Sequence, residues 1–429
     1  MFLRKIASSN LVRNVFAVAS GTALAQIVVV AFSPIITRIY GPEAFGLQGV
    51  FLSLVSIFSP LIALRYPMAI ITAEDDDEAL QLAQLSLVIA SILASTLFAI
   101  LFFFTEASAS LLGAAELGNL IFFLPIALLS VAIQNVTDYK AARVAAFRLI
   151  GIVSVAQAVI TNSFRAVGGL LSPVATVLII ITSFAPATHS AMLVLGSSKL
   201  RRRSGSATKR QIIALLKKYR DFAIYRAPTD FLNSASQAVP VILLSSFFSP
   251  TSAGFYVLTR SILNLPANIL SAAVGNVVYA RFGELKRNSL KLFPLLLKVT
   301  LSLMCLAPII AGLAYFLAPT VFSFVFGQEW KEAGRYAQWM SLWLGVALAN
   351  IPAVRVAPVI DSQRLLFFAN GGLLAARILS IVLVAKNNGS ALDAVISYSL
   401  VSLIGNLVLI FLLSRSCYIC DNAMKKSHS

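Results

Sequence analysis

Long apolar segments recur along the whole chain of 429 residues, with only short polar gaps between them. An α-helix needs about 20 such residues to cross the hydrocarbon core of a bilayer. A soluble fold of this size has no interior large enough to bury all of these segments. Only 12% of the residues are charged, and the mean hydropathy is +0.87. The sequence therefore predicts an all-α polytopic membrane protein.

The spacing of the apolar segments predicts twelve transmembrane helices. We expect them at residues 14–37, 46–71, 80–104, 117–136, 149–164, 168–196, 222–248, 254–280, 291–316, 332–353, 364–385 and 391–414. The first segment follows three basic residues and is too long for the apolar region of a signal peptide. We therefore expect it to remain as a signal anchor.

The distribution of positive charge orients these helices, because Lys and Arg collect in cytoplasmic loops. With the N-terminus inside, the inner segments hold 24 of the 34 Lys and Arg residues, the outer loops hold 5, and the remaining 5 lie within helices. This asymmetry accounts for the net charge of +17. The basic residues form no stripe with interleaved aromatics, so a nucleic-acid partner is not expected. Both termini are predicted to be cytoplasmic.

The largest polar gap divides the chain into two sets of six helices. We predict an N-terminal lobe at 1–196, a basic cytoplasmic linker at 197–221, and a C-terminal lobe with a cytoplasmic tail at 222–429. Apolar residues between Ile212 and Tyr219 have helical spacing beside basic ones. That stretch is either a short interfacial helix attracted to anionic lipid or a basic loop that only sets topology.

A weak internal repeat supports two related lobes. Pro42 and Pro250 are each followed four residues later by a glycine, Gly46 and Gly254, at a constant offset of 208 residues. Both pairs stand at the first outer loop of their half. Repeats of this kind are the usual construction of secondary transporters, with the two lobes around a central cavity.

The chain lacks the motifs that carry enzymatic chemistry, such as a nucleophile elbow, paired zinc ligands or a phosphate-binding glycine loop. His189 and His428 have no ligand-like spacing, and we interpret them as a helix-end residue and a tail residue. Cys417 and Cys420 form a C-x2-C with no second pair of ligands nearby. We expect no catalytic residue, no metal site and no cofactor.

Arginines inside the predicted helices are the most informative residues, because translocon scales assign roughly 2.5–3.5 kcal/mol to each one at a helix centre. Arg65, Arg260 and Arg377 lie within helices, and Arg38 lies at the outer end of the first. Arg65 is expected about 10 Å from the cytoplasmic end of a continuous second helix. These side chains either reach toward the nearer headgroups or line a central cavity that binds a phosphate or diphosphate.

Two further groups of charged residues have alternative interpretations. Arg226 and Asp230 are spaced i, i+4, which predicts an internal salt bridge. Alternatively Asp230, with Asn233 and Gln237 further along, is a protonation or cation site that couples transport to H+ or Na+.

The acidic run Glu74-Asp75-Asp76-Asp77-Glu78 precedes the third helix, where carboxylates favour the N-terminal dipole. We interpret the run as a solvated helix cap. A cytoplasmic gate in which Asp75, Asp76 and Asp77 pair with basic loops of the other half is the alternative.

The run SGTALAQIVVVAFSPIITRIYGPEAFGLQGVF and the later LRYPMAIITAEDDDEALQLAQLS resemble the start of the bacterial polysaccharide flippases. These flippases belong to the multidrug/oligosaccharidyl-lipid/polysaccharide exporter superfamily. The resemblance is specific over residues 20–90 and visible again in LTRSILNLPANILSAAVGNVVYARFGEL at 258–285.

The resemblance implies two six-helix lobes that open alternately to the cytoplasm and periplasm. It implies an undecaprenyl-diphosphate-linked oligosaccharide as substrate, such as an O-antigen or exopolysaccharide repeat unit. It also implies that Arg38, Arg65 and Arg260 face the cavity and that Asp230 takes part in ion coupling. At this place on helix eleven the related flippases often have an acidic or amide residue, whereas this chain has Arg377. This difference argues against a bound sodium ion.

We therefore expect a flippase of the bacterial cytoplasmic membrane. Its partners would be membrane lipid, the polyprenyl-diphosphate-linked oligosaccharide, and the polymerase and glycosyltransferases of the same pathway. A drug exporter of the same superfamily is the first alternative. A membrane polysaccharide polymerase or ligase is less favoured, because the long outer gaps at 105–116 and 317–331 contain no histidine.

The predicted orientation can be tested with reporter fusions. Alkaline phosphatase fused within 105–116 or 317–331 should be active, because those gaps are predicted to be periplasmic, and fusions within 197–221 or after Ser429 should be inactive. A green fluorescent protein fused at the same positions should give the opposite pattern. Active phosphatase at 197–221 would contradict the orientation.

Overall fold

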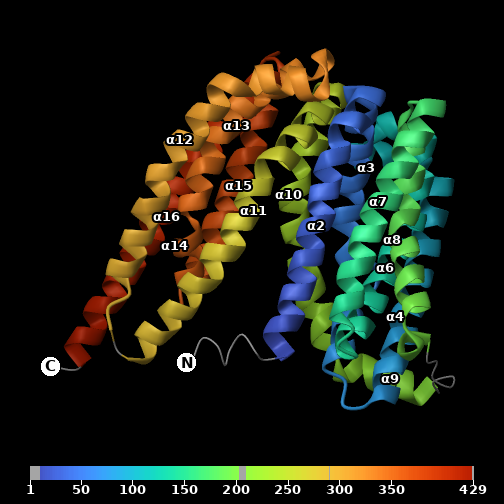
Figure 1. The fold of residues 1–429 in the computed structure, drawn as a ribbon, viewed down its shortest axis with the longest axis horizontal. Coiled ribbons are helices and arrows are strands. Elements are labelled where there is room, and N and C mark those ends of the chain that lie inside the picture. Colours follow the sequence, from blue (N-terminus) through green and yellow to red (C-terminus); the bar gives the residue numbers. More distant parts are fainter. Residues whose placement is uncertain (1–9, 202–208, 289, 428–429) are drawn as a thin grey trace. The chain divides into compact units, whose positions relative to one another are not determined.

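The computed structural model describes residues 10–201, 209–288 and 290–427, and every regular element in these ranges is helical (Figure 1). Twelve of the described helices are long. They are α2 (Asn10–Ile39), α3 (Pro42–Ile62), α4 (Asp76–Phe103), α6 (Phe123–Arg143), α7 (Phe147–Leu171), α8 (Ala175–Gly196), α10 (Ala227–Phe247), α11 (Pro250–Arg287), α12 (Phe293–Phe326), α13 (Lys331–Ala349), α15 (Gln363–Lys386) and α16 (Ala391–Ser427).

Shorter elements connect these helices. They are α5 (Thr105–Leu111), α9 (Lys209–Lys218), α14 (Ile351–Val356), the 3-10 turns η1 (Tyr66–Ile71), η2 (Ala115–Phe122), η3 (Ser198–Arg201) and η5 (Gln328–Trp330), and the π-helical turn η4 (Phe222–Arg226).

Within the described ranges, ten helical segments are long and apolar enough to cross a membrane. Of the twelve long helices, α10 and α11 do not belong to this set: Asp230, Asn233 and Gln237 interrupt the apolar sequence of α10, and part of α11 lies outside the residues whose side chains the structure describes. These are the two helices that carry Asp230, Asn233, Gln237 and Arg260. The predicted class, an all-α polytopic membrane protein, is confirmed.

The chain divides into two compact units, Met1–Ser246 and Phe247–Ser429. The division falls after Ser246, later in the chain than the polar gap at 197–221, so the first unit includes α9 and nearly all of α10. Residues 202–208 of that gap lie outside the described residues. The predicted lobe boundary at the polar gap therefore stays a prediction.

Glycine contacts bring α2 and α7 close together in the first unit, where Figure 1 shows them side by side. A Cβ added at Gly21 would lie 2.4 Å from the Cα of Gly151. A Cβ at Gly169 would lie 2.6 Å from the ring of Tyr40. Such small residues let membrane helices approach closely, where dispersion replaces the missing hydrophobic effect.

The second unit has the same kind of contact between α12 and α13. A Cβ at Gly334 would lie 2.4 Å from the Cα of Pro319. The last helix also caps α12, whose N-cap residue Leu292 offers no side-chain acceptor. Asp421 on α16 accepts hydrogen bonds from the backbone N–H groups of Leu292 at 3.0 Å and Phe293 at 2.8 Å. Asp421 is buried, so it satisfies two otherwise unpaired donors.

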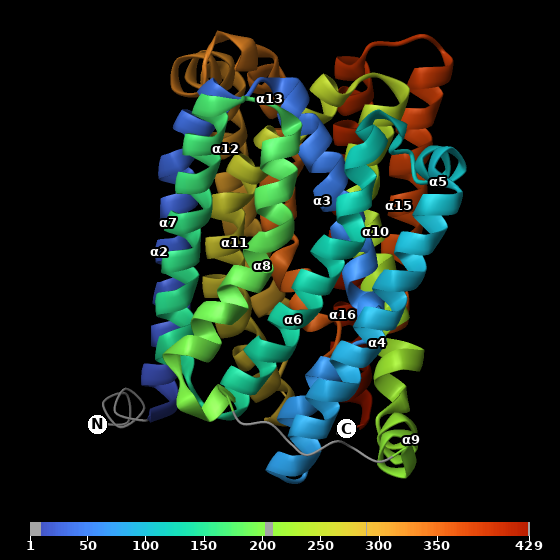
Figure 2. The same cartoon turned by 90° about the vertical axis from the view of Figure 1, so that its right-hand side faces the viewer.

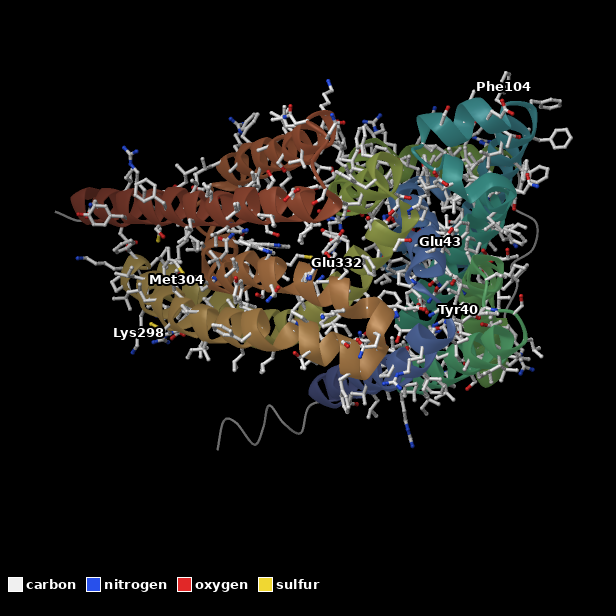
Figure 3. The ribbon with its side chains drawn as sticks, turned by 90° about the horizontal axis from the view of Figure 1, so that it is seen from above. Tyr40, Glu43, Phe104, Lys298, Met304 and Glu332 are labelled. Carbon is white, nitrogen blue, oxygen red and sulfur yellow. The ribbon has the colours of Figure 1, made fainter. Side chains whose placement is uncertain are left out.

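Large apolar side chains cover the outer surfaces of both units. Leu171 is 84% exposed and Phe324 is 79% exposed, values that require a lipid covering. Figure 3 shows Phe104 at the end of α4 and Lys298 on α12 pointing away from the helices around them. Lys298 is exposed, so its ammonium has a path along the helix to the headgroup region.

Two predicted breaks between helices are misplaced, and several predicted helix ends differ from the observed ones. The second helix does not run from 46 to 71, because it ends at Ile62 and restarts as η1 after Leu64 and Arg65, which have φ of 48° and 58°. Pro67 lacks the N–H that would continue the helix and its ring excludes the preceding turn. The fifth and sixth helices break at 172–174 instead of 165–167, with Pro173 in the turn.

The internal repeat has a structural counterpart. Pro42 and Pro250 each occupy the first turn of a long helix, α3 and α11, where a missing backbone N–H costs nothing. Gly46 and Gly254 are both buried one turn later. The matching sequence therefore marks the same kind of helix start in each unit.

Removing the cap on α12 should destabilise the second unit. We expect Asp421→Ala to lower the apparent melting temperature of the purified protein in detergent by several degrees, because about 1–3 kcal/mol is lost when buried donors lose their partner. Asp421→Asn should cost less because it keeps one acceptor. The matched control is Asp361→Ala, whose side chain is 87% exposed. Equal melting temperatures for Asp421→Ala and the control would contradict the capping role.

Candidate functional site

Asp230 lies between two arginines of the first unit. Its Oδ2 is 3.1 Å from Nε of Arg226, which donates a hydrogen bond to it, and 2.9 Å from Nε of Arg65. The Arg65 N–H is not aligned with the carboxylate, so this second contact is an ion pair without a hydrogen bond at that atom. The side chains of Arg65 and Asp230 are 23% and 16% exposed. The cluster carries a net positive charge, and the predicted i, i+4 salt bridge is present.

The break after α3 explains how Arg65 reaches Asp230. The depth expected for Arg65 in a continuous helix is wrong, because Arg65 stands in the left-handed conformation at the start of η1. Asn233 and Gln237 follow Asp230 along α10 as exposed side chains. Any proton or cation bound by Asp230 in this geometry competes with two guanidinium groups, and its coupling role stays a prediction.

A further arginine of the first unit was missed because it was assigned to an outer loop. Arg165 lies inside α7, which extends seven residues further than predicted. Its Nη2 donates to Oγ1 of Thr182 at 3.0 Å, and Gln48 donates to the same oxygen at 2.8 Å. Its Nε is buried without a hydrogen-bond partner. Among the described residues no carboxylate pairs with Arg165.

Arg377 is held by aromatic rings in the second unit. The carbon of its guanidinium lies 5.5 Å from the ring centroid of Trp343 on α13 and 5.5 Å from that of Tyr398 on α16. Its Nε donates to Oγ of Ser402 at 2.8 Å. Within the described part of the chain no carboxylate pairs with Arg377. The rings stabilise the cation through their faces and leave its charge uncompensated.

The structure brings Arg260 close to the same aromatic cluster. Tyr256, one turn before Arg260 on α11, packs edge-on against Tyr398 with centroids 6.0 Å apart. Because residues four apart lie on the same face of a helix, Arg260 lies on the face of α11 that carries Tyr256. Trp343 presents a buried indole N–H with no hydrogen-bond partner. We call the set Trp343, Arg377, Tyr398, Tyr256 and Arg260 the arginine cage.

The aromatic members of the arginine cage gave no signal in the sequence. Trp343, Tyr256 and Tyr398 lie on α13, α11 and α16, so only the packing of these helices brings them to Arg377 on α15. Arg38, in the last turn of α2, is an exposed side chain. The predicted site residues thus fall into separate sets, with Arg38, Arg65 and Arg226 in the first unit and Arg260 and Arg377 in the second. Convergence of all five on one cavity stays a prediction.

The acidic run caps α4 as expected. Asp75 accepts from the backbone N–H of Glu78 at 2.7 Å, and Glu78 accepts from that of Glu74 at 2.7 Å, a reciprocal pattern like a capping box. Asp76 lies 3.3 Å from Nε of Arg143 on α6. Asp77 is exposed. The gate role of this run stays a prediction, and the basic partners found here belong to the same unit.

The linker helix α9 docks against this run. Lys218 donates to Glu74 at 2.8 Å and to Glu78 at 2.6 Å, and these hydrogen bonds raise the pKa of Lys218. Leu215 and Tyr219 are buried against η1 and α4. Figure 2 shows α9 at the end of the bundle where α4 begins. The apolar face of the helix therefore packs on protein, which explains its amphipathic spacing without lipid.

A cavity of about 870 Å³ opens beside the capped end of α4. Three cationic side chains and one carboxylate line it, namely Lys140, Arg143, Lys199 and Asp76. Lys140 donates to the carbonyl of Leu200 at 3.0 Å. This end of the first unit is basic, as predicted from the loop charges.

Residues 35–335 match the family described as "Polysaccharide biosynthesis protein". This match covers well over half of the chain. No curated protein is significantly similar in sequence.

Two solved structures share the fold over nearly the whole chain. One is the inward-facing conformation of a multidrug resistance MATE family transporter of the MOP superfamily, with a TM-score of 0.72, 14% identity, and coverage of 94% of this chain and 96% of that one. The other is the lipid II flippase MurJ in an inward closed conformation, with a TM-score of 0.72, 13% identity, and coverage of 95% and 90%. A MATE transporter of Vibrio cholerae follows with a TM-score of 0.55, 16% identity, and coverage of 94% and 95%.

These likenesses establish the two-lobe fold of the superfamily, and the family match adds the link to polysaccharide biosynthesis. The solved relatives are described as transporters and a flippase. The chain therefore shares the fold of the solved MATE transporters and of the lipid II flippase, and it belongs to the polysaccharide biosynthesis protein family.

Proposed function

We propose that this protein moves an undecaprenyl-diphosphate-linked oligosaccharide, such as an O-antigen or exopolysaccharide repeat unit, across the bacterial cytoplasmic membrane. The family's link to polysaccharide biosynthesis supports a saccharide cargo. The likeness to a lipid II flippase supports a lipid-linked one. The glycosyltransferases and the polymerase of the pathway would supply and consume the substrate on opposite faces of the membrane.

The observation that carries this proposal is the arginine cage. An arginine in a membrane-spanning helix without a carboxylate partner is costly unless it serves a site. Arg377 is such a residue, and the rings of Trp343 and Tyr398 fix its planar guanidinium. A guanidinium of fixed orientation suits bidentate binding of phosphate oxygens. The unpaired indole N–H of Trp343 offers a further donor for the same headgroup.

Transport follows if the headgroup is bound while the lobes rock between two states. The sugars would enter a hydrated cavity, and the polyprenyl tail would stay in the surrounding lipid. Arg65, Arg226 and Arg38 would attract the anionic headgroup on the side of the first unit. The polar residues Asp230, Asn233 and Gln237 on α10 support contact of this helix with water and polar cargo.

A drug exporter is the second candidate, favoured by the fold shared with multidrug transporters. Many drugs of that class are cations, which a site holding two arginines would repel. Others are apolar molecules, which offer the arginines no negative charge. If deletion of the gene raises drug sensitivity and leaves surface glycan unchanged, the exporter is favoured over the flippase.

Loss of the charge in the arginine cage should reduce glycan export. In a strain that depends on this gene, Arg377→Ala should lower the rate of surface-glycan appearance about 10-fold to 100-fold, since a charge-assisted hydrogen bond to phosphate contributes about 1.5–3 kcal/mol. Arg377→Lys keeps the charge but not the planar stacking, and should give an intermediate rate. The double variant Arg65→Ala/Arg260→Ala should abolish export with normal protein in the membrane.

Arg335→Ala is the matched control for these variants. Arg335 pairs with Glu332 on its own helix at 3.0 Å and is 53% exposed. It should export at the wild-type rate. Normal export by Arg377→Ala, at wild-type protein abundance, would contradict a role of this arginine in headgroup binding.

The role of Arg65 can be separated from its ion pair with Asp230. If Arg65 serves only to neutralise Asp230, the paired variant Arg65→Gln/Asp230→Asn should export normally, because the buried charge is removed with its partner. If Arg65 binds the headgroup, the paired variant should remain as defective as Arg65→Gln. We expect the second result, measured by surface-glycan labelling. Full recovery in the paired variant would assign Arg65 to structure.

A further inference from the structure

The cavity of about 870 Å³ beside the start of α4 is a site that the proposed transport function does not use. Four elements of the first unit meet around it, namely η1, α4, α6 and η3. Its volume lies within the roughly 300–1,000 Å³ of pockets that hold small organic ligands. A bare ion would fill only a small part of this space. We call it the basic cavity.

The basic cavity lies where three apolar spans end. The span of α4 begins at Asp76, that of α6 ends at Arg143, and that of α8 ends at Gly196, just before η3. The ends of membrane spans stand at the level of the lipid headgroups. The basic cavity is therefore placed at the boundary between hydrocarbon and water.

Arg143 is held in a fixed position in the wall of the basic cavity. Its Nη1 donates to the carbonyls of Ile70 at 3.0 Å and Ala73 at 2.9 Å, and its Nε donates to Asp76 at 3.3 Å. The Nη2 group makes no hydrogen bond with any described residue. A guanidinium that is already ordered binds a ligand at little further cost in side-chain entropy.

Two lysines add free ammonium donors to the basic cavity. Lys140 donates to the carbonyl of Leu200 at 3.0 Å, and its ammonium carries two further N–H groups. Lys199 is exposed and makes no hydrogen bond or ion pair within the described part of the chain. With Arg143 and Asp76, the lining holds three positive charges and one negative charge. The net positive charge favours an anionic ligand.

The neighbouring carboxylates contact other groups. Glu74 and Glu78 accept hydrogen bonds from the linker helix α9. Oδ1 of Asp138 on α6 lies 3.0 Å from Nε2 of His189, whose Nδ1 lies 2.7 Å from Oε1 of Gln157 on α7. The interpretation of His189 as a helix-end residue is wrong, because it is buried inside α8. None of these three carboxylates occupies the free donors of the basic cavity.

Apolar side chains form the rest of the lining. Ile71, at the end of η1, is 47% exposed, and Leu80 and Val144 are half-buried. Inorganic phosphate has no apolar group to place against them. The glycerol backbone and first methylenes of a phospholipid would cover them and remove apolar surface from water. Cations beside an apolar wall therefore fit an anionic amphiphile.

We propose that the basic cavity binds the phosphate headgroup of an anionic phospholipid from the surrounding membrane. Its charge, its apolar wall and its place at the ends of three spans support this ligand. The loop charges predict that this end of the protein is cytoplasmic, and basic pockets between membrane helices on that side suit such headgroups. The site does not depend on the lipid-linked cargo of the proposed function.

A bound phospholipid would connect the four elements around the basic cavity. One of them, η1, begins directly after Arg65, which forms the ion pair with Asp230. The segment that lines the lipid site therefore also positions an arginine of the candidate transport site. A lipid that binds only the folded protein would stabilise this arrangement.

Lipid binding can be measured by native mass spectrometry of the purified protein in detergent. The wild type should bind phosphatidylglycerol more tightly than phosphatidylethanolamine, which has a phosphate but no net charge. The double variant Lys140→Gln/Lys199→Gln should bind phosphatidylglycerol about 30-fold more weakly, because each basic residue near an anionic headgroup contributes about 5-fold.

The matched control is Lys217→Gln/Lys291→Gln, which removes the same charge from exposed positions outside the basic cavity. It should bind phosphatidylglycerol as the wild type does. Equal weakening in both double variants would overturn the site, because binding would then follow net charge alone.

Ser198→Trp tests the site without changing any charge. Ser198 is an exposed residue of the lining, and an indole at this position would fill part of the space that the headgroup needs. This variant should also bind phosphatidylglycerol more weakly, and it keeps the test open if the lysine variant folds poorly. Unchanged binding by Ser198→Trp would overturn the site.

The source of the phosphate can be tested by competition. Inorganic phosphate in excess should not displace phosphatidylglycerol from the wild type, because it cannot contact the apolar wall. Displacement of the lipid by an equal concentration of inorganic phosphate would assign the basic cavity to a free anion and overturn the proposal. These measurements involve no transport assay, so failure of the proposed function would leave their result unchanged.

Discussion

The cost of placing charge in hydrocarbon governs the arrangement of this protein. An arginine or carboxylate in the apolar part of a membrane-spanning helix must find its stabilisation within the protein or reach the headgroups, because the hydrocarbon offers none. The structure uses two solutions. Asp230 takes up the charge of Arg65 and Arg226 through ion pairs, while Arg377 is stabilised by the faces of Trp343 and Tyr398 and one hydroxyl. The first solution compensates one of two positive charges, and the second leaves the charge of Arg377 available for an anion.

The sequence predicts the number of long helices, their approximate places and the membrane class, because hydropathy over 20 residues is a local property. It also predicts the Arg226 and Asp230 pair, which lies on one stretch of helix. The sites that depend on packing were not predictable. The rings around Arg377 come from α13 and α16, and the oxygens around His189 come from α6 and α7, so their proximity exists only after the helices assemble. Arg165 was assigned to an outer loop because apolar residues flank the short turn after α7, so hydropathy did not show where this helix ends.

One break in the backbone lies at a candidate site residue. Leu64 and Arg65 both have positive φ, which costs about 1 kcal/mol or more for a residue with a side chain. This conformation changes the direction of the chain after α3. As a result, Arg65 forms an ion pair with Asp230, and the apolar face of α9 packs against η1. A continuous helix would have carried Arg65 along the direction of α3. The two prolines that flank the break, Pro60 and Pro67, thus help to determine where a charge is placed.

The cap of α12 by Asp421 has a consequence for biogenesis. The acceptor lies in the last turns of the final helix, whereas the donors at Leu292 and Phe293 are synthesised long before it. Chains emerge from the ribosome N-terminus first. The start of α12 therefore enters the membrane with two unsatisfied N–H groups and waits for the end of the polypeptide. A chain truncated before Asp421 would hold the apolar spans of the second unit, yet the first two N–H groups of α12 would remain without their cap, and the start of this helix would be more exposed to quality-control proteases.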